Sequence, residues 1–311
     1  MHIILAAPRG FCAGVNMAID ALRRAIEQFG TPLYVYHEIV HNRWVVEDFR
    51  NRGVVFVDSL EDVPEGAVLM YSAHGVSPEV RRAAAERNLR TVDATCPLVM
   101  KVHREAIRFA RDGYTIVLIG HAGHDEVIGT LGEAPEAIHL VQSVEDVDRL
   151  PLATSERVAY LTQTTLSATD AAAIIERLRQ RFPAITGPAR GDICYATQNR
   201  QDAVRRLSRE VDRVLVVGSA NSSNSRRLAE IAAEEGVRAA LVDGPADIET
   251  GDFMDNETVL ITAGASAPER VVEQCVALLR QRFRATLETR EICREDLRFA
   301  VPAELRDFKG R

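Results

Sequence analysis

The sequence predicts an α/β protein made of three related units, each with a small and mainly parallel sheet. Short apolar segments alternate with amphipathic stretches along almost the whole chain, a pattern typical of parallel sheets covered by helices. Three apolar segments, at 33–40, 114–119 and 213–218, each follow an amphipathic stretch that begins beside a cysteine. These cysteines are Cys12, Cys96 and Cys194.

The spacings that follow these cysteines repeat as well. A polar residue lies 25 positions after each cysteine (37 − 12, 121 − 96 and 219 − 194), and a second lies 28 or 29 positions after it (41 − 12, 124 − 96 and 222 − 194). The next apolar segment then ends in one of three related phrases: VDSLEDV at 57–63, VQSVEDV at 141–147 and VDGPADI at 242–248. Such self-similarity indicates repeated supersecondary units, here with a period of about 90 residues.

The repeat also predicts how the chain is divided. A chain of 311 residues is long for one domain, which agrees with several compact units. We expect a first α/β unit at 14–96, a second at 97–193 and a third at 194–282. The N-terminal strand, within 1–13, is expected to join the third unit. Residues 283–311 are expected to form a C-terminal tail that closes over the functional site.

Equivalent positions of three related units are expected to meet around a common centre. Ligands of open parallel sheets bind beyond the carboxyl ends of the strands, and the predicted strands end in polar residues. We therefore expect the three cysteines to converge inside a ring of such residues. The ring is expected to contain His41, His74, His124, Thr164, Ser222, Ser223, Asn224 and Ser266.

Three converging cysteines have three interpretations. They could bind zinc with a histidine or a water as the fourth ligand, hold an iron–sulfur cluster, or be unbonded thiols. A lone cysteine is ordinarily a small buried apolar side chain, and this interpretation suits Cys275 in VVEQCVALL. Iron–sulfur clusters usually take four cysteines, so three ligands would leave one iron open to a substrate. The repeated position favours the cluster over zinc.

The polar ring is suited to an anionic small molecule. Residues 218–225, GSANSSNS, follow an apolar segment and precede a helical stretch, so N–H groups at the helix start can bind an anion beside the hydroxyls and amides. A single capping serine would explain only part of this loop. Such donors suit a phosphate or diphosphate. The pairs at 205–206 and 226–227, all arginines, are interpreted as solvated helix faces in preference to a docking patch for an acidic electron donor.

The composition limits the other classes of partner. A net charge of −7 (38 − 45) disfavours binding to nucleic acid or to an anionic membrane, and no apolar run approaches the length of a membrane span. The N-terminus lacks a basic n-region and is expected to be a strand rather than a signal peptide. Five cysteines without a CxxC pair predict a reducing compartment, the cytoplasm.

Nine motifs cover the chain from one end to the other. They are PRGFCAGV (8–15), VHN (40–42), SAHG (72–75), DATCPLV (93–99), GHAGHDEV (120–127), TQTTLS (162–167), DICYATQNRQ (192–201), NSSNS (221–225) and TAGASAP (262–268). In this order they resemble the motifs of the 4-hydroxy-3-methylbut-2-enyl diphosphate reductase family. Members of that family catalyse the last step of the non-mevalonate isoprenoid pathway. The resemblance continues into FAVPAELR (299–306).

The resemblance implies a trefoil of three α/β units around a central [4Fe-4S] cluster, one per subunit, held by Cys12, Cys96 and Cys194. It implies that the C4 oxygen of the allylic diphosphate substrate binds the open apical iron. Two electrons, from an external donor such as flavodoxin or ferredoxin, and protons would then give water and isopentenyl or dimethylallyl diphosphate. No partner of the nucleic-acid or membrane class is expected.

The resemblance also assigns roles to single residues. Thr164 matches the threonine near the substrate hydroxyl, and Glu126 matches the proton donor, whose pKa we expect to be raised beside an anionic ligand. Asp125 stands where the family commonly has proline, and Ala220 where a lysine is frequent. The positions that match diphosphate contacts are His41, His74, His124, Ser222, Ser223, Asn224 and Ser266.

Two alternatives belong to other functional classes. A three-cysteine zinc hydrolase acting on a phosphorylated small molecule is the first. The second is a non-catalytic cluster or ligand sensor. Colour separates the zinc protein from a cluster protein, and turnover of the allylic diphosphate separates an enzyme from a sensor.

Overall fold

The computed structural model describes residues 1–305, which form an α/β fold with three all-parallel sheets and confirm the predicted fold class. Two compact units divide the chain. The five-strand unit contains Met1–Asn16, Val40–Asp48 and Tyr195–Arg298. The two-sheet unit contains Met17–Ile39, Phe49–Cys194 and the segment that starts at Phe299. Residues 306–311 of the predicted C-terminal tail lie outside the described residues.

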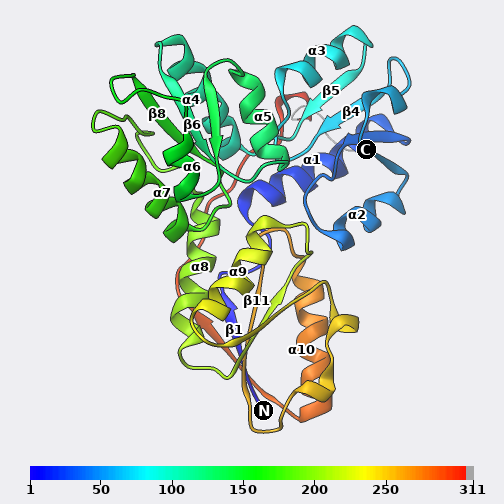
Figure 1. Ribbon diagram of the computed structural model, residues 1–311. Coiled ribbons are helices and arrows are strands. Elements are labelled where there is room, and N and C mark those ends of the chain that lie inside the picture. Colours follow the sequence, from blue (N-terminus) through cyan, green and yellow to red (C-terminus); the bar gives the residue numbers. More distant parts are fainter. Residues whose placement is uncertain (306–311) are drawn as a thin grey trace. The chain divides into compact units, whose positions relative to one another are not determined.

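One sheet organises the five-strand unit, with the order β10-β9-β11-β1-β12 and parallel pairing throughout (Figure 1). The N-terminal strand β1 pairs with β11, so that His2 lies opposite Thr258. It therefore completes the sheet formed by the strands of the third repeat. The strands are β1 (His2–Ala7), β9 (Arg213–Val217), β10 (Arg238–Val242), β11 (Thr258–Ala263) and β12 (Thr286–Glu291).

Helices cover both faces of this sheet, because the side chains of its buried strands alternate between two apolar cores. Ile3 and Leu5 of β1 pack in the core that contains α10, whereas Ile4 and Ala6 pack in the core that contains α8 and α9. The helices are α8 (Tyr195–Ser208), α9 (Ser223–Glu234) and α10 (Glu269–Phe283), with short 3-10 turns at Pro245–Asp247 and Thr250–Asp252.

The strand β12 differs from the expected organisation. Its sequence, TLETRE, lies in the segment expected as a C-terminal tail, yet it forms the edge of the five-stranded sheet beside β1. Five of its six residues are exposed. An edge strand that buries so little needs no apolar alternation, and its charged side chains protect the edge from pairing with another chain. The pattern that predicts buried strands is therefore missing here.

The two-sheet unit contains a four-stranded sheet, β3-β2-β4-β5, and a three-stranded sheet, β7-β6-β8, both entirely parallel (Figure 1). The strands of the first sheet are β2 (Leu33–Tyr36), β3 (Val54–Val57), β4 (Val68–Tyr71) and β5 (Arg90–Asp93). Those of the second are β6 (Thr115–Ile119), β7 (Ile138–Val141) and β8 (Val158–Thr162).

Alternating side chains also place helices on both faces of the three-stranded sheet. Val117 and Ile119 of β6 pack in the core of α6 and α7, while Ile116 and Leu118 pack in the core of α4 and α5. The helices of the whole two-sheet unit, including α3 beside the four-stranded sheet, are α3 (Pro78–Glu86), α4 (Pro97–Arg111), α5 (Asp125–Glu133), α6 (Val144–Arg149) and α7 (Ala168–Arg181), with 3-10 turns at Leu60–Asp62 and Ala303–Leu305. Two helices, α1 (Ala13–Phe29) and α2 (Arg43–Arg50), begin in the five-strand unit and end in the two-sheet unit.

The three repeats share one backbone hydrogen bond at each cysteine. The N–H group of every one of these cysteines donates to the carbonyl oxygen two residues beyond the end of a strand, β11, β4 or β8. The pairs are Cys12 with Ala265 (3.1 Å), Cys96 with Ala73 (2.9 Å) and Cys194 with Thr164 (3.0 Å). The self-similarity read from the sequence is therefore present in the hydrogen bonding.

The expected alignment of the repeats is wrong by one residue in the first unit. Three N–H groups follow β2, β6 and β9 and donate to the last valine of the neighbouring strand: His37 to Val57, Gly120 to Val141 and Gly218 to Val242. Gly120 and Gly218, not His121 and Ser219, are thus the counterparts of His37. The first repeat has one more residue between cysteine and strand end (37 − 12 = 25, against 120 − 96 = 24). In this alignment His41, His124 and Ser222 each follow four residues later.

Within residues 1–305, no helix combines the length and apolarity needed to cross a membrane.

Candidate active site

Each of the three repeat cysteines directly precedes a helix. Cys12 comes before α1, Cys96 before α4 and Cys194 before α8, and all three are half-buried. Cys96 is the N-cap residue of α4, and its side chain makes no capping hydrogen bond to that helix. A helix N-terminus favours negative charge, which suits a thiolate that acts as a metal ligand. Cys12 belongs to the five-strand unit, and Cys96 and Cys194 belong to the two-sheet unit. The convergence of all three stays a prediction.

Glu126 and Thr164 form a buried pair in the two-sheet unit. The backbone N–H of Thr164 donates to Oε1 of Glu126 at 2.6 Å, and the Thr164 hydroxyl donates to Oε2 at 2.9 Å. The two residues are only 2% and 5% exposed. Burial raises the pKa of Glu126 to about 7, although both hydrogen bonds from Thr164 oppose that shift. A carboxyl group in this state can hold a proton near neutral pH and also release it.

His124 begins the helix that carries this glutamate. It is the N-cap of α5, and its Nδ1 accepts the N–H of Glu126 at 3.2 Å. Because Nδ1 accepts a hydrogen bond, the ring proton of neutral His124 is on Nε2, where it can be donated to a ligand. The ring of His74 meets that of His124 edge to face, with 5.8 Å between centroids. The structure thus brings His74, His124, Glu126 and Thr164 into one neighbourhood.

Asp125 has a defined partner. Its Oδ1 lies 2.8 Å from Nδ1 of His37, and its Oδ2 lies 4.0 Å from Nδ1 of His74. The hydrogen bond that the His37 ring donates to Asp125 raises the pKa of His37 despite partial burial of the ring. Asp125 also lies in the first turn of α5, where a negative charge is favoured by the helix dipole. Asp125 is therefore a hydrogen-bond partner of His37.

The serine-rich loop lies in the five-strand unit, at the start of α9. Ser222 is the N-cap residue, and its hydroxyl accepts the N–H of Ser225 at 3.3 Å. Ser225 is wholly buried beside Gly218 and Gly264, where an added Cβ would approach its Oγ to 2.3 and 1.9 Å. These two glycines allow the ends of β9 and β11 to close around the start of the helix. Ser222, Ser223 and Asn224 are thereby held in a fixed backbone.

Asn224 is the most informative residue of this loop. It is 4% exposed, and neither its Nδ2 nor its Oδ1 has a hydrogen-bond partner among residues 1–305. A buried amide without partners is costly and rare. A ligand that accepts from Nδ2 would remove this cost. The capping serine that the sequence suggested accounts for Ser222, and it leaves Asn224 available for binding.

His41 and Ser266 also belong to the five-strand unit, and they are tied to each other. The hydroxyl of Ser266 donates to the carbonyl oxygen of His41 at 2.8 Å. Two residues further on, the N–H of Arg43 donates to Oγ of Ser219 at 3.0 Å. The loop that carries His41 is thus attached to the ends of β9 and β11. The five-strand unit brings together His41, Ser222, Ser223, Asn224 and Ser266.

Two pairs of charged residues beside the cysteines were not singled out in the sequence. Nζ of Lys101 on α4 lies 2.7 Å from Oδ1 of Asp192, two residues before Cys194. Arg200 on α8 is wholly buried, lies 3.0 Å from Glu295 and donates to the carbonyl oxygen of Gly10 at 2.7 Å. Both contacts join residues about 90 or more positions apart, so no local pattern could reveal them. The only indication of these pairs in the sequence is that one charged residue of each lies close to a repeat cysteine.

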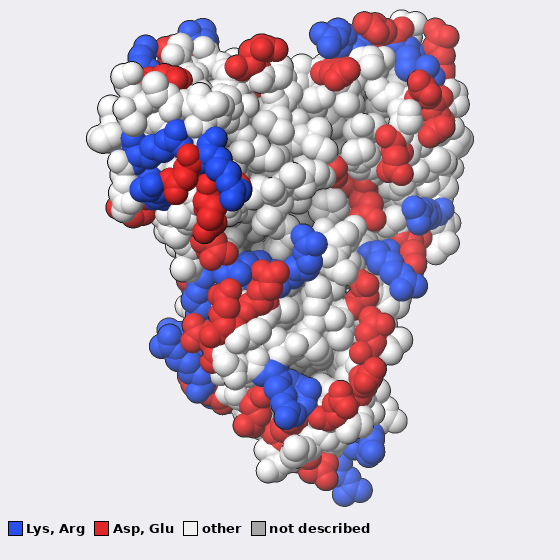
Figure 2. Space-filling view, viewed as in Figure 1, with Lys and Arg blue, Asp and Glu red and all other residues white. Residues whose placement is uncertain are grey.

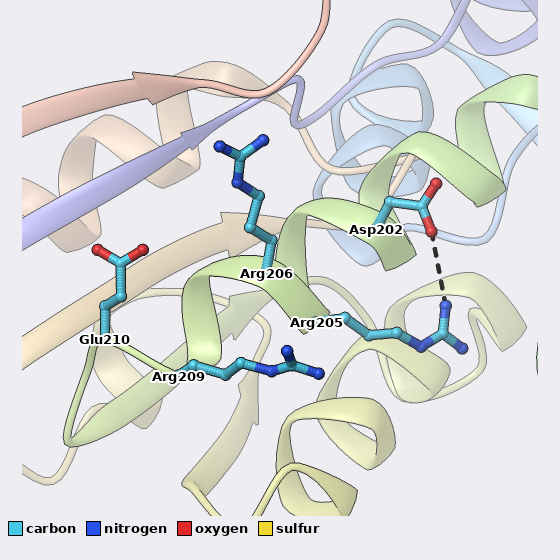
Figure 3. Close-up of a pocket in the computed structure, with 5 residues that line it drawn as sticks. All are labelled: Asp202, Arg205, Arg206, Arg209 and Glu210. Carbon is cyan, nitrogen blue, oxygen red and sulfur yellow. Dashed lines mark ion pairs between the residues drawn. The ribbon is translucent and has the colours of Figure 1, made fainter.

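A charged hollow on α8 contains none of the predicted site residues. Asp202, Arg205, Arg206, Arg209 and Glu210 line it (Figure 3). Arg205 lies 3.7 Å from Asp202, and Arg209 lies 3.2 Å from Glu235. Figure 2 shows basic and acidic side chains interspersed over the face of the molecule that it draws. The paired charges agree with the interpretation of the arginines at 205–206 as a solvated helix face.

The chain resembles known proteins over most of its length. The family model described as LytB protein matches residues 3–280. The chain belongs to the LytB family. It is 60% identical over 308 residues to the 4-hydroxy-3-methylbut-2-enyl diphosphate reductase of Rhodopirellula baltica, covering 99% of this chain and 97% of that protein. It is 53% identical to the enzyme of the same name from Histophilus somni, covering 98% of each.

Solved structures agree with the LytB assignment. The E-1-hydroxy-2-methyl-but-2-enyl-4-diphosphate reductase of Plasmodium falciparum superposes with a TM-score of 0.95 and 39% identity, covering 98% of this chain and 96% of that one. A second structure, of (E)-4-hydroxy-3-methyl-but-2-enyl diphosphate reductase, described as the terminal enzyme of the non-mevalonate pathway, has a TM-score of 0.65 and 31% identity. It covers 90% of this chain and 100% of that one. The family resemblance read from the nine motifs is confirmed.

Proposed function

We propose that this protein is a 4-hydroxy-3-methylbut-2-enyl diphosphate reductase of the non-mevalonate pathway. The substrate takes up two electrons and two protons, loses its C4 hydroxyl as water, and gives isopentenyl or dimethylallyl diphosphate. Two relatives with this name match the chain over nearly their full lengths. The observation that carries the proposal in this chain is the buried pair of Glu126 and Thr164, which provides an acid with a pKa of about 7.

We propose a [4Fe-4S] cluster, one per subunit, with Cys12, Cys96 and Cys194 as ligands. Thiolates are the preferred ligands of such clusters. The matched position of each cysteine, before a helix and bonded to a strand-end carbonyl, supports a shared role for the three side chains. When bound, the cluster would supply the electrons and an iron site open to the substrate oxygen. The residues are thus chemically suited to the group that the family implies.

The protein's own residues would bind and protonate the substrate. Glu126 is proposed to hold the proton that is transferred, and the hydroxyl of Thr164 to orient the carboxyl group and the substrate hydroxyl. The unpaired amide of Asn224 supports its assignment to the diphosphate subsite. The proposed diphosphate contacts are His41, His74, His124, Ser222, Ser223, Asn224 and Ser266. We place the reaction in the cytoplasm, with an external electron donor such as flavodoxin or ferredoxin.

Anaerobic purification tests this proposal. Iron and sulfide are counted in the fresh protein, which is then assayed with reduced methyl viologen and the allylic diphosphate. We expect a brown protein with four irons and four sulfides per chain and rapid formation of both products. A colourless, zinc-containing protein that hydrolyses phosphate esters would establish the zinc alternative. A brown protein without turnover would be a sensor, and full activity with fewer cluster irons would overturn the cluster assignment.

A further inference from the structure

A lysine on the helix that begins at Cys96 reaches the loop that ends at Cys194. Lys101 lies five residues after Cys96 on α4 (101 − 96). Its Nζ donates to the carbonyl oxygen of Arg190 at 2.5 Å and to Oδ1 of Asp192 at 2.7 Å. All of these residues belong to the two-sheet unit. One side chain therefore spans the two segments that carry two of the proposed cluster ligands.

Asp192 is fixed on its second side as well. Its side chain is wholly buried, and Oδ2 accepts the backbone N–H of Thr162, the last residue of β8, at 3.0 Å. Two residues beyond the strand, the carbonyl oxygen of Thr164 accepts the N–H of Cys194 at 3.0 Å. A carboxylate held between an ammonium group and a backbone N–H has little freedom to move. The loop of residues 190–194 is thereby attached to both α4 and β8.

The same residues reach the proposed proton donor. Thr164, whose carbonyl holds the N–H of Cys194, also donates both hydrogen bonds to Glu126. A shift of the loop at 190–194 would pull on Cys194 and on the segment that positions Glu126. Lys101 contacts neither a thiol nor the carboxyl group of Glu126 in any described hydrogen bond or ion pair. Its influence on them is exerted through Asp192 and the loop.

We infer that Lys101 and Asp192 form a positioning pair that sets the place of Cys194 relative to Cys96. This inference rests on the proposed function insofar as the two thiols hold the cluster. The pair acts by keeping the loop at 190–194 against α4, so that the separation of the thiols does not vary. Outer residues that orient metal ligands typically change metal affinity ten- to hundredfold when mutated. A pair that only stabilised the fold would affect both cysteines alike.

The test compares the unmodified protein with three variants of the full chain, purified without air. Lys101→Met removes the ammonium group and keeps the length of the side chain, and Lys101→Arg keeps the charge. The matched control is Arg177→Met, which breaks the exposed ion pair with Asp148, also in the two-sheet unit. If Lys101→Met does not fold, the double variant Lys101→Met/Asp192→Asn takes its place, since it removes both charges of the Lys101–Asp192 pair.

Two measurements are made on each folded variant. The first is the rate of iron loss to a chelator, well below the melting temperature. The second is the ratio of alkylation rates at Cys194 and Cys96, followed by peptide mass spectrometry. For Lys101→Met we expect iron loss to accelerate roughly tenfold or more and the ratio to rise severalfold. Lys101→Arg and Arg177→Met should stay near the unmodified protein.

The two measurements separate this inference from the proposed function. Unmodified protein without iron would contradict the cluster, while the alkylation ratio would still decide whether the pair positions Cys194. An unchanged ratio in a folded Lys101→Met or double variant would overturn the inference. So would an equal rise at both cysteines, because that is the behaviour of general destabilisation.

Discussion

Thr164 donates both its backbone N–H and its hydroxyl to the carboxyl group of Glu126, at 2.6 and 2.9 Å. The two residues are 38 positions apart, on α5 and beyond the end of β8. Burial raises the pKa of Glu126 to about 7, and the hydrogen bonds restrain that rise. The balance keeps the acid near the middle of its titration under physiological conditions, which is the state best suited to proton transfer.

Replacing Glu126 by glutamine should abolish most of the turnover. The amide keeps the shape of the side chain but cannot donate an acidic proton, and loss of a general acid typically costs about 100- to 10,000-fold in rate. The measurement is turnover with reduced methyl viologen, normalised to iron content. Glu126→Gln with an intact cluster and near-normal turnover would remove Glu126 from the mechanism.

The same substitution should change how stability depends on pH. A carboxyl group whose folded pKa of about 7 lies above its unfolded value stabilises the fold fully below the unfolded pKa, and this stabilisation is lost as the pH rises through 7. Glu126→Gln has no such loss. Relative to the unmodified protein, the variant should therefore gain stability between pH 5 and pH 8, by up to roughly 3 kcal/mol. Melting temperatures at both pH values test this, and a constant difference would contradict it.

Removing the hydroxyl of Thr164 should shift the activity profile. Thr164→Val deletes the hydrogen bond to Oε2 of Glu126 that lowers the pKa, so that pKa should rise further. Turnover should fall, and the remaining activity should persist to higher pH than in the unmodified enzyme. Thr164→Ser keeps the hydroxyl and serves as the control. A pH–rate profile of Thr164→Val that coincides with that of the serine variant would show that the hydroxyl does not set the pKa.

Substituting Asp125 should lower the pKa of His37. The carboxylate raises that pKa through a hydrogen bond at 2.8 Å, and Asp125→Asn removes its charge while retaining the shape of the side chain. The His37 ring should then release its proton at lower pH, as followed by NMR of the imidazole resonances. Asp148→Asn, at an exposed ion pair in the same unit, is the matched control. Equal titration curves in all three proteins would show that Asp125 exerts no influence on His37.

Asn224 offers a variant in which stability and affinity should change in opposite directions. Its buried amide has no partner among residues 1–305, so Asn224→Leu should leave the melting temperature of the ligand-free protein unchanged or raise it. The KM for the diphosphate substrate should nevertheless increase, by about tenfold for one lost hydrogen bond to a charged ligand. Thr262→Val removes a similarly unpaired buried hydroxyl from β11 and should leave KM unchanged. Unchanged KM in Asn224→Leu would exclude Asn224 from the subsite.

Sequence patterns predicted the parts of this molecule that repeat. The same local sequence pattern surrounds Cys12, Cys96 and Cys194. The family motifs also predicted the reaction, and the names of the relatives confirm that prediction. The unit boundaries, the cluster and the site roles stay predictions. What the patterns missed depends on contacts remote in sequence: Lys101 reaches a carboxylate 91 positions away, and His37 one 88 positions away. Neither pair leaves a periodic signal. The alignment was wrong by one residue because the first repeat has an extra residue between its cysteine and the end of its strand. Equal spacing in sequence therefore does not identify equivalent positions in the sheets, whereas the hydrogen bonds do.

The bond that each repeat cysteine makes to a strand-end carbonyl uses only the backbone N–H. Every amino acid except proline carries that group. The hydrogen bond at each of these three positions therefore does not depend on which side chain the residue has. The backbone architecture at these three positions is thus separable from the chemistry of the side chains that they carry. The three repeats can therefore carry different side chains on one backbone frame, with an acid in the second repeat and serines in the third.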